Sequence, residues 1–201
     1  MRLSLQSLIL TMSIWLLLTA ALRAETIQVD AELVLAVDVS RSMSPAELDI
    51  QRRGYAQALV SDEVIDAISD GLLGRVAIQY VEWAGQYDQR ILVDWTLIEE
   101  RADAQAFAEQ LLAHASLSMS RTSISGGINF AVSAIDTNAY SGSRRIIDIS
   151  GDGPNNQGGR VDRARDEAVD RGIVINGLPI MAEPWMGGLG FNISGLDVYY
   201  R

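Results

Sequence analysis

Short apolar runs alternate with segments of helical periodicity along most of the chain. Residues 32–39 (ELVLAVDV) form the first apolar run, which ends close to an aspartate. A run of this kind is typical of a buried parallel strand whose carboxyl end meets solvent. The sequence SPAE then supplies an N-cap serine, a first-turn proline and a capping glutamate. We therefore expect a helix over about 44–61, with 62–69 adding a further turn or two.

The next part of the chain predicts two strands that pair with each other. Residues 75–83 (RVAIQYVEW) alternate in the manner of a strand, and residues 89–95 (QRILVDW) form a second one. Only a short link around Gly85 separates them. The short link indicates an antiparallel pair, with one member at an edge of the sheet.

The remaining segments continue the alternation of helices and strands. Helical periodicity covers 102–115 and 125–135, residues 145–150 (RIIDIS) are strand-like, a charged amphipathic helix spans 161–171, and 172–180 predicts another strand. This order predicts an α/β fold: a three-layer, doubly wound, Rossmann-like sheet that is mostly parallel, with one antiparallel edge strand. In such folds ligands bind in the crevice at the carboxyl ends of the strands.

The first two dozen residues differ in kind from the rest. Arg2 is followed by an almost unbroken apolar run over 8–18 and by small residues up to Ala24. This pattern is typical of a signal peptide over residues 1–24, because a membrane-spanning helix needs about 20 apolar residues. We expect a single domain over residues 25–201 that is periplasmic or secreted and is not inserted in a membrane after cleavage. An uncleaved N-terminal anchor is the alternative.

The composition narrows the classes of function. The 26 acidic residues outnumber 16 basic residues, all of them arginine, and the net charge is −10. A surface of that sign repels nucleic acid and anionic membranes, so we expect no nucleic-acid partner. Cysteine is absent, so we expect neither disulfides nor a lipid anchor on cysteine.

Three oxygen-rich segments carry the candidate chemistry. Asp38, Ser40 and Ser42 lie at the end of the first strand, where they can turn three oxygens toward one point. Thr122 lies in a hydroxyl-rich loop (RTSISGG) at a helix start, and Asp152 follows another strand in SGDG. Hard oxygen donors of this kind suit Mg²⁺ or Mn²⁺, and such an ion keeps positions free for water or an external ligand. These five residues form our predicted metal site.

The order and spacing of these segments resemble the metal-ion-dependent adhesion site of von Willebrand factor A and integrin I domains. The resemblance covers residues 32 to about 180, and DVSRSM and DISGDGPNN look most like an uncharacterised exported bacterial branch of that family. It implies that Ser40, Ser42 and Thr122 are direct or near-direct ligands, while the aspartates often act through water. It also implies a protein partner that presents a carboxylate, and a binding role in place of catalysis.

The sequence departs from the family pattern at three places. Arg121 stands where many relatives carry glycine, and Gly151 stands where threonine or serine is common before the aspartate. The family usually adds another strand and a final helix beyond the segment that here stops at Arg201, so a C-terminally truncated domain is one interpretation. Two alternatives to a binding module stay open: a metal-dependent hydrolase, and a structural domain whose metal site has decayed.

Other catalytic classes fit the sequence less well. An aspartate phosphotransferase needs a second carboxylate two residues after the first, and position 40 is serine. A serine hydrolase needs a histidine base, but the only histidine, His114, lies near the end of an alanine-rich helix. There it is interpreted as stabilising the helix C-terminus. Residues 151–159 (GDGPNNQGG) are interpreted as a loop, with Asn155 and Asn156 shaping its turn. We therefore expect no enzyme activity and no catalytic residues.

Overall fold

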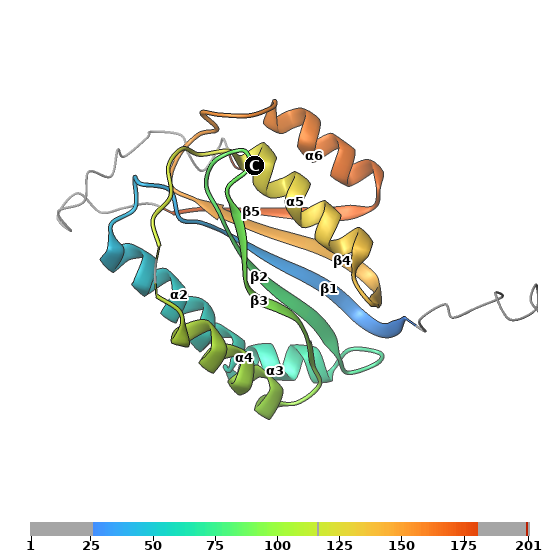
Figure 1. Cartoon of the computed structure of the whole chain (residues 1–201). Helices are drawn as coiled ribbons and strands as arrows, with labels where there is room; N and C mark the ends of the chain where they lie inside the picture. The colour runs from blue at the N-terminus through green and yellow to red at the C-terminus, as the bar shows by residue number, and fades with distance from the viewer. Residues whose placement is uncertain (1–25, 116, 181–199, 201) are drawn as a thin grey trace, which may run out of the picture.

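The computed structural model describes residues 26–115, 117–180 and 200. A five-stranded sheet has the strand order β3-β2-β1-β4-β5 (Figure 1). The strands are β1 Ile27–Asp38, β2 Val76–Trp83, β3 Gln89–Ile98, β4 Tyr140–Gly151 and β5 Ile173–Pro179. The helices are α2 Pro45–Leu59, α3 Asp62–Ser69, α4 Arg101–Ala113, α5 Ile124–Thr137 and α6 Val161–Asp170. In this part of the chain no helix has the length and apolar character to cross a membrane; the predicted signal peptide lies outside the described residues.

The sheet confirms the predicted fold class. β1 pairs in parallel with β2 and β4, and β4 pairs in parallel with β5, whereas β3 runs antiparallel to β2 at the edge. In this register Asp38 lies opposite Trp83, and Val37 lies opposite Ser150. The carboxyl ends of β1, β2 and β4 therefore meet at one edge of the sheet, where the predicted crevice belongs.

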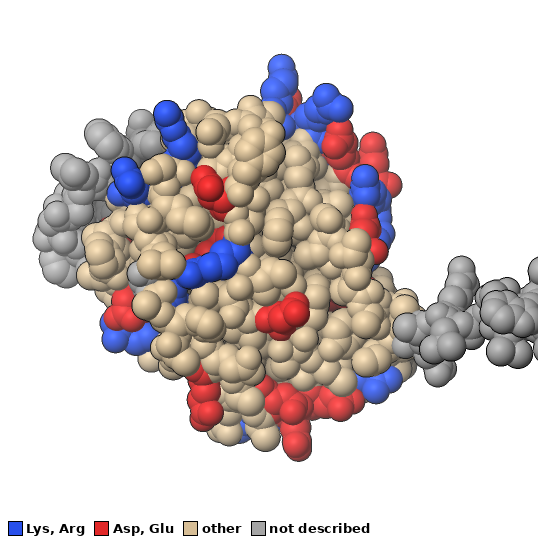
Figure 2. Space-filling view, in the orientation of Figure 1, with Lys and Arg blue, Asp and Glu red and all other residues tan. Residues whose placement is uncertain are grey.

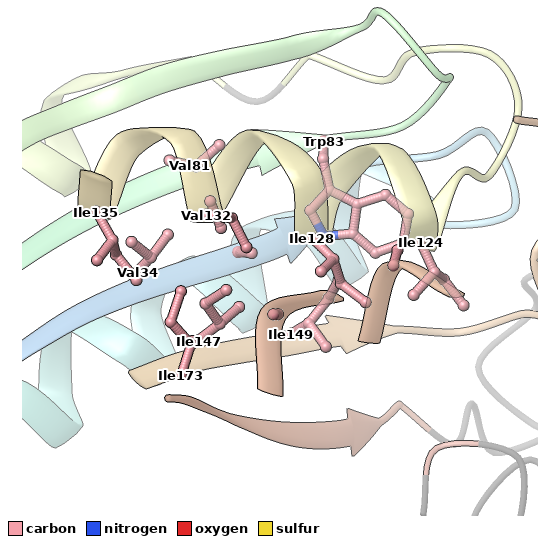
Figure 3. Close-up of a cluster of buried hydrophobic side chains, with 14 residues drawn as sticks. Val34, Val81, Trp83, Ile124, Ile128, Val132, Ile135, Ile147, Ile149 and Ile173 are labelled. Carbon is pink, nitrogen blue, oxygen red and sulfur yellow. The ribbon is translucent and has the colours of Figure 1, made fainter. Parts of the chain in front are cut away.

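Helices cover both faces of the sheet, with α5 and α6 on one face and α2, α3 and α4 on the other (Figure 1). Val34 and Ala36 of β1 belong to the hydrophobic cluster under α5 and α6, which Figure 3 shows from close by. Leu35 and Val37 belong to the cluster under the other three helices. Because successive side chains of a strand point to opposite faces, a strand buried on both faces is apolar at nearly every position. This explains the unbroken run in the sequence.

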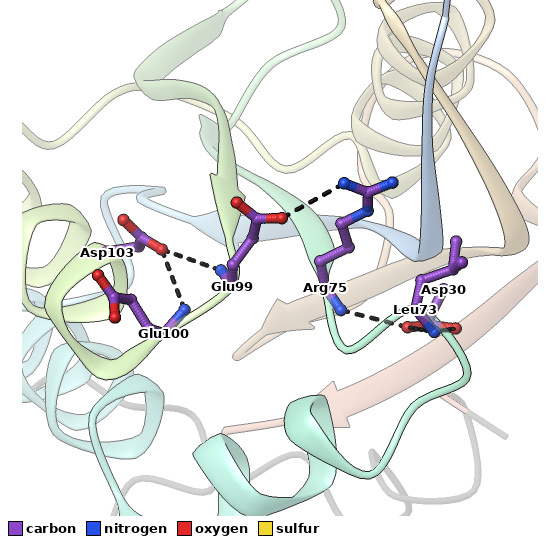
Figure 4. A network of polar contacts seen from close by, with 6 residues as sticks. All are labelled: Asp30, Leu73, Arg75, Glu99, Glu100 and Asp103. Carbon is purple, nitrogen blue, oxygen red and sulfur yellow. Dashed lines mark hydrogen bonds and ion pairs between the residues drawn. The ribbon is translucent and has the colours of Figure 1, made fainter.

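Two strands are longer than the apolar pattern predicted. β1 begins at Ile27 in place of residue 32, and β4 begins at Tyr140 in place of residue 145. The added part of β1 contains Asp30, whose carboxylate accepts hydrogen bonds from the backbone N–H groups of Leu73 at 3.0 Å and Arg75 at 3.2 Å (Figure 4). Pairing with neighbouring strands satisfies the backbone here, so a strand continues where its sequence is no longer apolar.

Helix α5 comes very close to the sheet at Gly127. A β carbon added there would lie 3.1 Å from Cγ and Cδ2 of Trp83, whose side chain is fully buried. We expect Gly127→Ala to lower the free energy of unfolding by about 1–3 kcal/mol, because the packed core has no room for the methyl group. Gly54→Ala in α2 is the matched control, since nothing lies within 4 Å of its added β carbon. There the better helix propensity should raise stability by about 0.5–1 kcal/mol.

Urea denaturation of the two variants beside the parent measures both changes. A Gly127→Ala protein as stable as the parent would contradict the close packing of α5 on Trp83.

Candidate metal centre

Asp38 is the last residue of β1 and is completely buried at the carboxyl edge of the sheet. Its Oδ1 accepts a 2.7 Å hydrogen bond from the backbone N–H of Ser40, so the chain turns over the carboxylate directly after the strand. Its Oδ2 is buried and has no hydrogen-bond partner among the described residues. A buried carboxylate oxygen without a donor has lost its hydration and gained nothing in return, which is costly unless a proton or a cation binds there.

The environment of Asp38 disfavours its ionised form. Burial raises the pKa of the Asp38 carboxyl to about 7; the hydrogen bond from Ser40 opposes the rise, and the negative charge of Asp152 adds to it. Burial also raises the pKa of Asp152, against a hydrogen bond from Ser42. Two carboxyl groups that both resist ionisation mark a place where a bound cation would be most favourable.

A chain of hydrogen bonds links the first and third predicted segments. The hydroxyl oxygens of Ser40 and Ser42 lie 2.8 Å apart, and the Ser42 hydroxyl donates to Oδ1 of Asp152 at 2.7 Å. Together with the Ser40 N–H bonded to Asp38, this forms one continuous cluster. The structure thus brings together four of the five predicted site residues, although Asp152 stands 110 positions after Ser42 in the chain.

Thr122, the fifth predicted residue, is buried in the loop between α4 and α5. That loop runs beside the first segment through a parallel bridge between Ser40 and Met119, in which the Met119 N–H donates to the carbonyl of Val39 at 2.9 Å. The loop is also tied to the segment after β4, because the Thr122 N–H donates to Oδ1 of Asn156 at 2.9 Å. Within the described part of the chain no hydrogen bond joins the Thr122 hydroxyl to the other four residues, and backbone contacts of the loop hold Thr122 beside them.

Two asparagines have a larger role than the sequence suggested. The Asn156 side chain accepts from the N–H of Thr122, and the backbone N–H of Asn156 donates to the Thr122 carbonyl at 2.8 Å. Oδ1 of Asn155 accepts from the N–H of Ser125 in the first turn of α5 at 3.3 Å. The interpretation as turn formers was therefore incomplete, since both amides fasten the second loop to the third. The only signal in the sequence is their position three and four residues after Asp152, and their partners lie about 30 residues earlier in the chain.

The two residues that depart from the family pattern, Arg121 and Gly151, each have a structural counterpart. Arg121 has a φ of 75°, in the left-handed region that favours glycine, so its conformation costs about 1–2 kcal/mol. At Gly151 an added β carbon would collide with the hydroxyl of Tyr200 and lie 3.0 Å from Oδ2 of Asp38. Glycine at this position makes room for Tyr200, whose hydroxyl donates to the carbonyl of Gly153 at 3.1 Å.

The chemistry of the donor set fits a small divalent cation. The cluster presents carboxylate and hydroxyl oxygens, which are hard ligands, and one buried carboxylate oxygen in it has no donor in the part of the chain that the structure describes. Across the residues that the structure describes, no three His, Cys, Asp or Glu side chains gather in a way that suits a metal. A metal here would therefore depend on serine and threonine hydroxyls together with two carboxylates.

The strand order, the antiparallel edge strand and the helices on both faces define a von Willebrand factor A-like fold. The chain belongs to the family described as "Protein of unknown function (DUF1194)", whose model matches residues 28–201. No curated protein sequence matches it.

Solved structures with little sequence identity share this fold. Proximal thread matrix protein 1 from the mussel byssus matches with a TM-score of 0.59 and 13% identity over 79% of this chain. BatB from Bacteroides thetaiotaomicron matches with a TM-score of 0.53 and 21% identity, over 81% of this chain and 73% of its own. Another structure of the mussel protein, with a TM-score of 0.54 and 13% identity over 79% of this chain, has a zinc-occupied MIDAS motif. This chain spans 40% of the mussel protein chain.

Proposed function

We propose that the protein is an exported binding module that engages a partner protein through a divalent cation, Mg²⁺ or Mn²⁺. The residues that would hold the cation are Asp38, Ser40, Ser42, Thr122 and Asp152. The observation that carries the proposal is the buried Oδ2 of Asp38, which has no hydrogen-bond donor among the described residues and belongs to a cluster of hydrogen-bonded oxygens from two distant segments. The zinc-occupied MIDAS motif of a protein with the same fold supports this choice.

The charges of the donor set favour an acidic ligand from the partner. Three of the five donors are neutral hydroxyls, so the protein supplies only two carboxylates. Their combined negative charge does not exceed the positive charge of a divalent cation. When bound, such a cation would offer an open position to a carboxylate of the partner. The protein itself carries a net charge of −10 and repels acidic ligands without it. Binding of an acidic partner should therefore depend strongly on the metal.

A binding role suits this cluster better than catalysis. Asp38 is buried under the turn at Ser40, and Asp152 accepts a hydrogen bond from the Ser42 hydroxyl. Both carboxylates would be engaged in holding the cation, which would leave neither of them as a general base toward water or a substrate. Export is part of the same proposal: with the signal peptide over residues 1–24 removed, the domain would bind its partner in the periplasm or outside the cell.

Calorimetric titration of the purified protein with Mg²⁺ and with Mn²⁺ tests the site. We expect the parent to bind one ion and both Asp38→Ala and Asp152→Ala to lose binding, because each removes one of only two carboxylates. Asp148→Ala is the matched control: Asp148 lies on the same strand as Gly151, but its carboxylate accepts from Asn176 at 2.6 Å. It should bind metal like the parent.

The other outcomes separate the alternatives. A parent that binds neither ion, with the same melting temperature at every Mg²⁺ concentration, would indicate a structural domain with a decayed site. Metal-dependent turnover of generic ester or phosphate substrates, lost in Asp38→Ala, would indicate a hydrolase.

A further inference from the structure

Two exposed arginines flank the candidate metal cluster. Arg41 stands between Ser40 and Ser42, and Arg121 stands directly before Thr122. Both side chains are exposed, and neither has a hydrogen bond or ion pair with any residue that the structure describes. Each segment that contributes candidate hydroxyl ligands thus also carries one positive charge that has no partner among the described residues.

Almost all other arginines of the described residues are paired with a carboxylate. Ten arginines form ion pairs, and Figure 2 shows basic side chains beside acidic ones at several places on the visible face. In this part of the chain only Arg41, Arg121 and Arg144 are left without one. Carboxylates outnumber arginines in this protein, yet two of the three arginines without an ion pair in the described part of the chain stand beside the cluster.

The backbone places both arginines at the same edge of the sheet. The parallel bridge between Ser40 and Met119 aligns the two segments side by side in the same chain direction. Arg41 follows this bridge by one residue and Arg121 by two. Arg121 also keeps a φ of 75°, although no contact of its side chain within the described part accounts for that strain. Strained backbone without a structural reason is more frequent at binding sites than elsewhere.

We propose that Arg41 and Arg121 form a cationic rim that selects a partner segment with several clustered carboxylates. The inference rests on the proposed function: one carboxylate of the partner would meet the cation, and the neighbouring carboxylates would meet the two guanidinium groups. Guanidinium groups bind carboxylates through two parallel hydrogen bonds, which adds geometric selectivity to the charge. The rim also reverses, at this one edge, the repulsion that an acidic segment meets over the rest of the protein.

Two synthetic peptides with blocked ends test the rim. One contains a single aspartate among glycines, and the other contains the same aspartate followed by two glutamates. Binding to the purified protein is measured at low ionic strength, with Mg²⁺ and with a chelator, because exposed charge pairs weaken with salt. We expect the parent to prefer the triacidic peptide by about tenfold, and Arg41→Gln and Arg121→Gln each to reduce that preference by about two- to fivefold. Binding of Mg²⁺ and of the monoacidic peptide should not change.

Arg144→Gln is the matched control. Arg144 is exposed and lacks a partner among the described residues. It lies on β4 opposite Ala31 of β1, roughly 20 Å before the carboxyl end of β4 at about 3.3 Å per residue. This variant should keep the preference of the parent. All three variants should also keep the melting temperature of the parent, which shows that they fold.

The outcomes separate the rim from the metal site. A parent without preference for the triacidic peptide, or an Arg41→Gln/Arg121→Gln protein that keeps the full preference, would overturn the rim. Failure of the parent to bind Mg²⁺ would overturn the proposed metal site. If the preference still depended on the two arginines in the presence of the chelator, the rim would stand without the metal.

Discussion

Without divalent cations the protein should be about 3 kcal/mol more stable at pH 5 than at pH 7 to 8. Burial raises the pKa of Asp38 from 3.8 to about 7 in the folded protein. Between these values the folded protein holds a proton that the unfolded chain has released. The contribution to stability is therefore complete below about pH 4 and is lost as the pH rises through 7, at about 1.4 kcal/mol per pH unit between about pH 5 and pH 6.5, with little further change above pH 7.5.

The measurement is urea denaturation in a chelator at pH 5, 6, 7 and 8. Asp38→Asn should remove most of the dependence and be more stable than the parent at pH 8, because the amide never has to ionise in a buried position. Asp148→Asn, on the neighbouring strand, should keep the dependence. Adding Mg²⁺ at pH 8 should restore stability to the parent but not to Asp38→Asn. Stability that rises from pH 5 to pH 8 in the chelated parent would show that Asp38 is ionised in the folded protein at low cost.

The Glu82→Gln substitution should lower the free energy of unfolding by about 3–5 kcal/mol and the melting temperature by about 10 °C or more. Glu82 is 1% exposed on β2 and forms ion pairs with Arg52 of α2 and Arg90 of β3. Arg52 is 4% exposed and also donates to the backbone carbonyl of His114 at the end of α4. Removal of the Glu82 charge leaves the Arg52 guanidinium buried without a counter-ion.

Arg90→Gln separates this effect from a general loss of charge. The Arg90 side chain is 35% exposed, so water replaces its partner and the cost should be about 1 kcal/mol or less. A double Arg52→Met, Glu82→Leu variant should recover much of the loss, because an apolar pair of similar volume needs no counter-ion. Chemical denaturation of the parent and the variants measures the free energy of unfolding, and thermal denaturation measures the melting temperature. Equal losses for Glu82→Gln and Arg90→Gln would mean that Arg52 is not held by Glu82.

The sequence was most informative where chemistry follows the chain locally. Residues 32–39 are buried on both faces of the sheet, so their apolar pattern identified the central strand directly. The capping residues around Ser44 predicted the start of α2, where the hydroxyl of Ser44 accepts from the N–H of Glu47. The link around Gly85 is short enough that only an antiparallel pair can form across it, and β2 and β3 form that pair.

The candidate site was predictable as a set of residues but not as a cluster. The sequence by itself placed Asp38, Ser40 and Ser42 at the end of a strand, because their spacing is local. The parallel pairing of β1 with β4 and the path of two loops bring the more distant residues to this place. They allow Ser42 to donate to Asp152, and Thr122 to donate to Asn156. Local propensity carries no information about either.

Burial, in the same way, was decided only by the tertiary structure. The sequence determined that Glu82 and Arg52 are charged and that one follows strand periodicity and the other helix periodicity. Only the packing of α2 against the sheet shows that these charges are buried and paired with each other. Likewise the pattern around Asp38 predicted an oxygen ligand. Its raised pKa, and an Oδ2 without a donor among the described residues, arise from burial at the end of the strand. Periodicity along one segment thus determined the elements and their chemistry, and long-range packing decided the electrostatics, because desolvation depends on neighbours that are distant in the sequence.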